Sequence, residues 1–107
     1  MIKQYEIFLI DLNPTKGSEI NKVRPCLVIS PDEMNYHLNT IIIAPLTSKI
    51  KNNYPFRTKT KIKNTESHIA LDQIRTLDKR RFIKKIGKLN KKEIQEVKNI
   101  LEEMLIK

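Results

Sequence analysis

The chain has 107 residues, 39% of them hydrophobic, and a formal net charge of +9 from 21 basic and 12 acidic side chains. A chain of this length forms one domain around one modest core, so we expect a single domain over residues 1–107. The single cysteine excludes an intramolecular disulfide, and no apolar run approaches the roughly 20 residues that cross a bilayer. No leader-like segment is recognisable, so the sequence predicts a cytoplasmic protein without membrane contact.

The positive charge is concentrated in one region. Residues 49–92 contain 15 basic and 3 acidic side chains, whereas the rest of the chain contains 6 basic and 9 acidic ones. A field of this sign attracts polyanions, which makes nucleic acid, an acidic protein partner, or both the natural ligands. The alternative is a solvated, lysine-rich surface with no ligand.

Strands are predicted where β-branched and aromatic residues gather between turn-forming residues. Pro31, with two acidic residues after it, predicts one short helical turn, and Pro45 is expected to place the end of its strand at an edge or a bulge. Short strands at regular spacing favour a small β-barrel over a parallel sheet. The predicted strands cover residues 5–12, 23–30, 39–46, 55–62, 68–71, 73–77 and 82–89.

An amphipathic helix is predicted at the C-terminus. Asn90 has the side chain of an N-cap, and Glu93, three residues later, can complete a capping box. Apolar residues recur after it at helical spacing and predict one buried face. These are Ile94, Val97, Leu101, Met104 and Leu105.

The segment 16–30 holds the first candidate site residue. Pro25 moves Arg24 toward an extended conformation, just before the apolar run that starts at Cys26. Arg24 is therefore expected at a loop-to-strand junction, where a rigid strand anchors it and its head can meet a ligand. Thr47 follows a predicted strand in the same way. The alternatives are a surface arginine on a turn and an ordinary turn threonine.

The segment 72–81 combines hydrogen-bond donors and acceptors with positive charge, which suits phosphate contacts and base-edge readout. A charged hairpin is the alternative. Cys26, His37 and His68 have no metal-ligand spacing, and Cys26 lies in an apolar run where a buried thiol needs no further explanation. We therefore expect no metal site and no cofactor.

Several of these motifs together resemble the MazF/PemK family of toxin endoribonucleases. Their order and spacing match along the whole chain. The resemblance implies a mainly β fold with a C-terminal helix, an SH3-like, partly open β-barrel that forms a homodimer. The motifs are Lys16-Gly17-Ser18-Glu19, Arg24-Pro25, Leu27-Val28-Ile29-Ser30, Pro45-Leu46-Thr47-Ser48, and the stretch from Leu71 to Asp78.

The resemblance also implies an activity, namely metal-independent cleavage of single-stranded RNA, especially mRNA, at short sequence motifs. The implied products carry 2′,3′-cyclic phosphate and 5′-hydroxyl ends, and an acidic antitoxin neutralises the enzyme in a complex that binds DNA. Arg24 and Thr47 match the catalytic pair of the family. Tyr54 and Phe56 could stack on bases, because the chain has no tryptophan. The RNA-binding residues expected are Lys16, Ser18, Glu19, Tyr54, Phe56, Gln73, Arg75, Lys79 and Arg80.

Two other functions fit the same barrel. One is a toxin that acts by binding DNA gyrase, and the other is an RNA-binding barrel without activity, since a fold by itself does not settle function. Arg24-Pro25 and Thr47 favour the nuclease, because a pure binder has no need of that pair.

Overall fold

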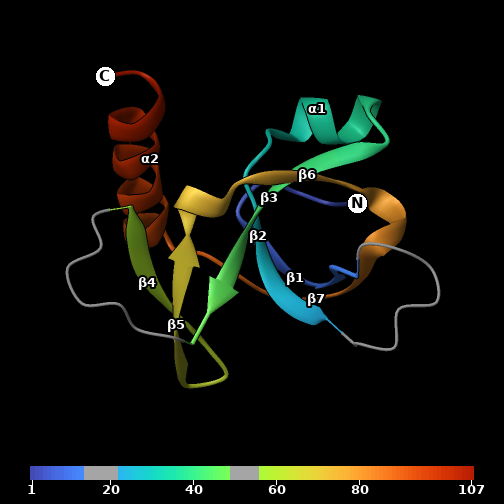
Figure 1. Cartoon of the computed structure of the whole chain (residues 1–107), viewed down its shortest axis with the longest axis horizontal. Helices are drawn as coiled ribbons and strands as arrows, with labels where there is room; N and C mark the ends of the chain where they lie inside the picture. The colour runs from blue at the N-terminus through green and yellow to red at the C-terminus, as the bar shows by residue number, and fades with distance from the viewer. Residues whose placement is uncertain (14–21, 49–55) are drawn as a thin grey trace.

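The computed structural model describes residues 1–13, 22–48 and 56–107. In this part of the chain, short strands and tight turns are followed by a longer helix at the C-terminal end (Figure 1). The elements are β1 (Glu6–Asp11), β2 (Val23–Val28), α1 (Asp32–His37), β3 (Thr40–Thr47), β4 (Arg57–Ile62), β5 (Thr65–Ala70), η1 (Leu71–Gln73), β6 (Arg75–Asp78), η2 (Lys79–Arg81), β7 (Phe82–Lys88) and α2 (Lys91–Leu105).

The strands form one curled antiparallel sheet in the order β4-β5-β3-β2-β1-β7, with β6 paired to β3 outside this path. Strand β3 is the centre of the sheet, because it pairs with β2, β5 and β6 along different parts of its length. The predicted fold, a mainly β, partly open barrel with a C-terminal helix, is confirmed.

Most strand boundaries differ from the prediction by one to three residues; Gln73, predicted in a strand, lies in η1, and Thr47, predicted to follow its strand, is the last residue of β3. The turn predicted at 63–67 is only two residues long, because Ile62 already pairs with Thr65 and both turn residues, Lys63 and Asn64, have positive φ of 48° and 67°. Pro45 was expected at an edge or a bulge. It lies instead inside β3, where it pairs with Cys26 of β2. Its missing N–H is tolerated because β3 changes its pairing partner at the next residue.

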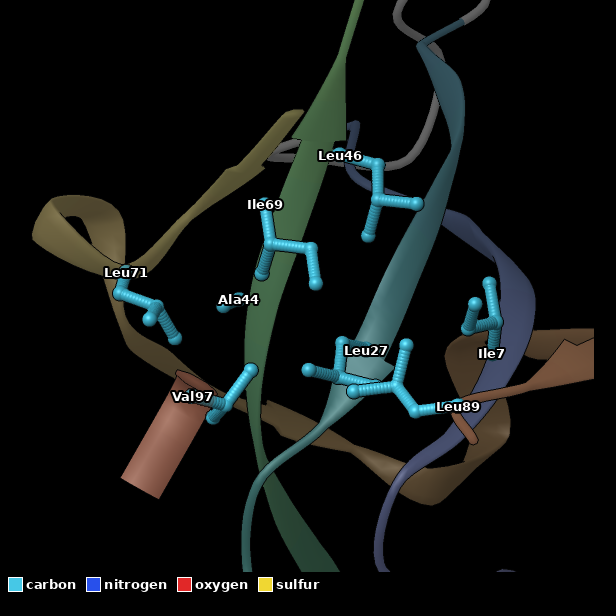
Figure 2. Close-up of a cluster of buried hydrophobic side chains, with 8 residues drawn as sticks. All are labelled: Ile7, Leu27, Ala44, Leu46, Ile69, Leu71, Leu89 and Val97. Atoms are coloured by element: carbon cyan, nitrogen blue, oxygen red, sulfur yellow. The ribbon is translucent and has the colours of Figure 1, made fainter. Parts of the chain in front are cut away.

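Buried side chains occupy both faces of the sheet, whereas composition predicted one core. The first cluster is covered by α2 and includes Leu89 and Val97 (Figure 2). Because side chains alternate along a strand, Phe8, Cys26 and Ile43 point to the other face, where they form a second cluster. The curl of the sheet encloses this second face without a helix.

The C-terminal helix begins as predicted. Asn90 accepts a hydrogen bond from the Glu93 N–H at 2.8 Å, and the Glu93 side chain accepts one from the Asn90 N–H at 2.9 Å. Val97 is fully buried, but Leu105 is 65% exposed, so its predicted place in the buried face is wrong. It is the last residue of the helix and lies beyond the cluster that α2 covers. No helix in the described ranges is long and apolar enough to cross a membrane.

Candidate functional site: a pocket where the sheet divides

Strands β2 and β3 separate at a defined point, which we call the fork. Their pairing runs from Val28↔Ile43 to Cys26↔Pro45 and stops there. Beyond this point β2 stays paired with β1, whereas β3 continues beside β5. Figure 1 shows the start of β2 next to β1 and the end of β3 next to β5. The sheet therefore opens between β2 and β3 at one end.

Arg24 and Thr47 occupy the two sides of this fork. The β2–β3 register pairs residues whose numbers add to 71, since 26 + 45 and 28 + 43 both give 71. Its continuation places Arg24 opposite Thr47, and opposite residues of antiparallel strands point to the same face. Arg24 is exposed and Thr47 is half-buried. The two residues thus face a common space from strands that no longer pair with each other.

That space is a pocket of about 620 Å³. Four cationic side chains line it, and a hydroxyl and an amide add neutral hydrogen-bonding groups. Such a lining suits a phosphate-bearing ligand, because guanidinium and ammonium groups neutralise its charge. The lining residues are Leu12, Lys22, Arg24, Pro45, Leu46, Thr47, Arg57, Ala70, Gln73 and Arg75.

Gln73 and Arg75 line the pocket from the segment that runs beside β3. Arg75 pairs with Ile43, so its side chain leaves the same face of the sheet as those of Pro45 and Thr47. Gln73 lies in η1, the short turn that joins β5 to β6. Both side chains are exposed, as a ligand contact requires. The structure therefore brings together four of the predicted site residues, Arg24, Thr47, Gln73 and Arg75.

Sequence reasoning missed Lys22 and Arg57. The guanidinium of Arg57 forms a two-point ion pair with Asp72, with Nε–Oδ1 at 3.0 Å and Nη2–Oδ2 at 3.3 Å. The Arg57 side chain is only 8% exposed. In the sequence, Arg57 is one of 15 basic residues between 49 and 92. Nothing in its neighbours distinguishes it, because its partner is 15 residues away.

Cys26, two residues after Arg24 in β2, is fully buried. Burial raises the pKa of its thiol to about 12, although the charges of Arg75 and Arg24 oppose this shift. The thiol is therefore protonated at neutral pH and has no thiolate character to act as a nucleophile.

The remaining predicted residues do not join this pocket. Lys79 and Arg80 form η2 at the far end of β6 from Arg75, and Arg80 is paired with Asp78 at 3.1 Å. Phe56 is half-buried and does not line the pocket. The other four, Lys16, Ser18, Glu19 and Tyr54, lie outside the described residues.

The two histidines lie in different elements, His37 in α1 and His68 in β5. Within residues 1–13, 22–48 and 56–107, no three His, Cys, Asp or Glu side chains are grouped as a metal site would require.

Comparison with known families shows one clear match. The family described as "PemK-like, MazF-like toxin of type II toxin-antitoxin system" matches residues 3–105. The Endoribonuclease MazF of Staphylococcus saprophyticus is 37% identical over 107 residues, which cover 95% of this chain and 89% of that protein.

Solved structures agree on the fold. MazF from Deinococcus radiodurans is 26% identical, with a TM-score of 0.76 over 97% of this chain and 96% of that one. The MazE-MazF structure (Form-II) from the same organism has 24% identity and a TM-score of 0.81 over 97% and 95% of the two chains. A mycobacterial endoribonuclease in complex with its cognate antitoxin has 17% identity and a TM-score of 0.81, over 98% of this chain and 95% of that chain.

Proposed function

This chain belongs to the family of PemK-like, MazF-like toxins of type II toxin–antitoxin systems, and from that membership we infer that it is an endoribonuclease toxin whose active site is the pocket at the fork. The observation that carries the assignment of the site is the convergence of Arg24, Thr47, Gln73 and Arg75 on one pocket. They come from β2, β3, η1 and β6, and only the fold brings them together.

The substrate we propose is single-stranded RNA. RNA carries its own nucleophile, the 2′-hydroxyl, so the enzyme needs to hold the backbone for in-line attack and stabilise the charge on the phosphorane. The 2′-oxygen loses its proton to water and forms a bond to phosphorus, while the bond to the 5′-oxygen breaks and that oxygen takes up a proton from water. The products are a 2′,3′-cyclic phosphate and a 5′-hydroxyl. Neither step requires a metal ion if the protein supplies positive charge at the phosphate.

Arg24 is suited to that task. Its exposed guanidinium stands at the mouth of the fork and can bind two phosphate oxygens at once through its planar donors. An arginine is hard to deprotonate, so we assign it charge stabilisation at the phosphate and hydrogen-bond donation to the leaving 5′-oxygen rather than the role of a base. Thr47, opposite it, binds a phosphate oxygen through its hydroxyl. Arg75 and Gln73 contact the neighbouring RNA.

The partners follow from membership in the family. We propose that the chain is a homodimer, that it acts in the cytoplasm, and that an acidic antitoxin binds it. Residues 49–92 contain 15 basic and only 3 acidic side chains, and this excess of positive charge supports an acidic partner.

The decisive experiment is incubation of the purified protein with a long RNA in excess chelator, followed by mapping of the fragment ends. We expect cuts at a short recurrent sequence, each leaving a 5′-hydroxyl. Cleavage that needs a divalent ion, or random degradation, would contradict the proposed chemistry. Binding of RNA without any cleavage would instead favour a non-catalytic RNA-binding barrel.

A further inference from the structure

Arg24 borders a second pocket as well as the first. This second pocket has a volume of about 450 Å³. It shares Lys22, Arg24 and Leu46 with the pocket at the fork. The rest of its lining is apolar or carries hydroxyl groups: Val23, Pro25, Ser48 and Ser67.

The two pockets lie on opposite faces of the sheet. In β2, Val23 and Pro25 alternate with Arg24 and point to the same face as Leu27, which belongs to the cluster under α2. In β5, Ser67 shares a face with Ile69, another member of that cluster. Arg24 and Thr47 point to the other face. The shared residues Lys22 and Arg24 therefore stand at the end of the sheet, between one pocket and the other.

This arrangement matches a requirement of the chemistry. For the 2′-oxygen to attack in line with the leaving 5′-oxygen, the two nucleotides that flank the scissile phosphate must be splayed rather than stacked. A phosphate held at Arg24 has one pocket on each side. Its two nucleotides can therefore enter pockets on opposite faces of the sheet, which unstacks them.

We propose that the second pocket is a base-reading subsite for one of the two nucleotides that flank the cleaved bond. The inference rests on the proposed ribonuclease function. Val23, Pro25 and Leu46 offer apolar contacts to the faces of an unstacked base, and the hydroxyls of Ser48 and Ser67 can hydrogen-bond its edge. A base bound in this pocket keeps the two nucleotides at Arg24 apart. The subsite therefore contributes both to the choice of the cleaved sequence and to the cleavage rate.

The test uses single-turnover cleavage of a short RNA that contains the mapped cut site. One of the two nucleotides that flank the cut enters the second pocket. Replacing that nucleotide by an abasic residue should slow cleavage by the parent protein about tenfold or more. Ser67→Ala and Ser48→Ala should each weaken the base preference at that same position, by up to about tenfold for one lost hydrogen bond, and leave the other positions unchanged. Ser67→Trp, which fills the pocket, should lower the rate at saturating RNA and make the abasic substitution harmless.

Thr65→Ala is the matched control, because Thr65 lies on the same strand and the same face as Ser67 but outside the pocket. Ser48 is exposed, so its substitution tests the pocket even where a change at Ser67 perturbs folding. Unchanged base preference at both flanking positions in Ser48→Ala and Ser67→Ala would overturn the subsite while leaving the ribonuclease intact. Absence of cleavage by the parent would instead overturn the proposed function itself.

Discussion

Arg57 in β4 and Asp72 in η1 are joined by two parallel hydrogen bonds of 3.0 and 3.3 Å, and the arginine side chain is almost completely buried. The pair connects the edge strand of the sheet to the turn that carries Gln73. A buried ion pair costs desolvation when it forms, but removal of one partner leaves an uncompensated charge in the interior. The pair is therefore expected to matter most when it is broken on one side.

Asp72→Asn should lower the free energy of unfolding by about 2–4 kcal/mol, somewhat below the usual cost because Asp72 is 20% exposed. Urea denaturation measures this directly. Glu66→Ala, which breaks the exposed Lys59–Glu66 pair of 3.8 Å, is the control and should change stability by at most about 0.5 kcal/mol. Equal losses in the two variants would show that the buried pair has no special role.

Arg24→Lys should lower the cleavage rate at saturating RNA by about 100-fold or more. The substitution keeps the charge but removes the planar fork that can hold two phosphate oxygens. Single-turnover kinetics with excess enzyme measures it, and thermal melting checks that the variant is folded. Near-parental cleavage would show that Arg24 is not the residue that stabilises the transition state.

Lys79→Ala and Arg80→Ala provide the contrast to Arg24. These residues lie in η2, away from the pocket, so we expect them to contact RNA phosphates outside the reacting bond. Each loss should weaken RNA binding and reduce the salt slope by about one unit, without lowering the rate at saturation. Measurement of affinity at several salt concentrations distinguishes this from a catalytic defect.

The antitoxin should compete with RNA for the cationic pocket. An acidic, partly disordered segment is complementary to Lys22, Arg24 and Arg75, and its affinity should fall as salt rises. Cleavage assays at increasing antitoxin should show inhibition that excess RNA relieves. If saturating antitoxin bound the protein and left cleavage unchanged, the shared-site hypothesis would be wrong.

Glu6 should make stability depend on acid pH. Burial alone would raise the pKa of its carboxyl, but hydrogen bonds from Lys85 at 2.6 Å and the Lys3 N–H at 2.8 Å, with their charges, bring that pKa below its ordinary 4.5. A lowered pKa in the folded state stabilises the protein above the ordinary value, and this stability is lost as pH falls through the lowered pKa. The difference in unfolding free energy between the parent and Glu6→Gln should be constant from about pH 5 to 8 and shrink below about pH 4.5. A difference that does not change with pH would contradict this role.

His68→Val should stabilise the fold. His68 is 7% exposed, and its Nε2 is buried with no hydrogen-bond partner in the described part of the chain. A buried nitrogen without a hydrogen bond lowers the free energy of unfolding by about 1–3 kcal/mol. Valine removes this atom and suits a strand position, but it loses some packing, so we expect a net gain in stability of about 1 kcal/mol. His37→Ala, a change at an exposed histidine, should alter stability by less than about 0.5 kcal/mol. Destabilisation by His68→Val in thermal melting would show that the imidazole has a partner in solution.

Local sequence patterns were sufficient to locate most of the strands and the C-terminal helix. β-Branched runs between turn residues located the strands, and the Asn90–Glu93 capping box marked the start of α2, because these features depend on residues a few positions apart. Arg24 and Thr47 were candidates because each lies near the point where an apolar strand meets a polar loop, and the family resemblance then proposed a catalytic role for them. The sequence by itself thus determined where the strands and the C-terminal helix lie and which residues stand near their ends.

Only the tertiary structure decided what lies opposite what. The change of partner along β3 places Thr47 across from Arg24, buries Arg57 against Asp72, and sets a pocket on each face of the sheet at Lys22 and Arg24. Cross-strand register joins residues far apart in the chain, and a shift of one position would turn every side chain to the other face. No short stretch of sequence contains that information, because it resides in the packing of the whole sheet.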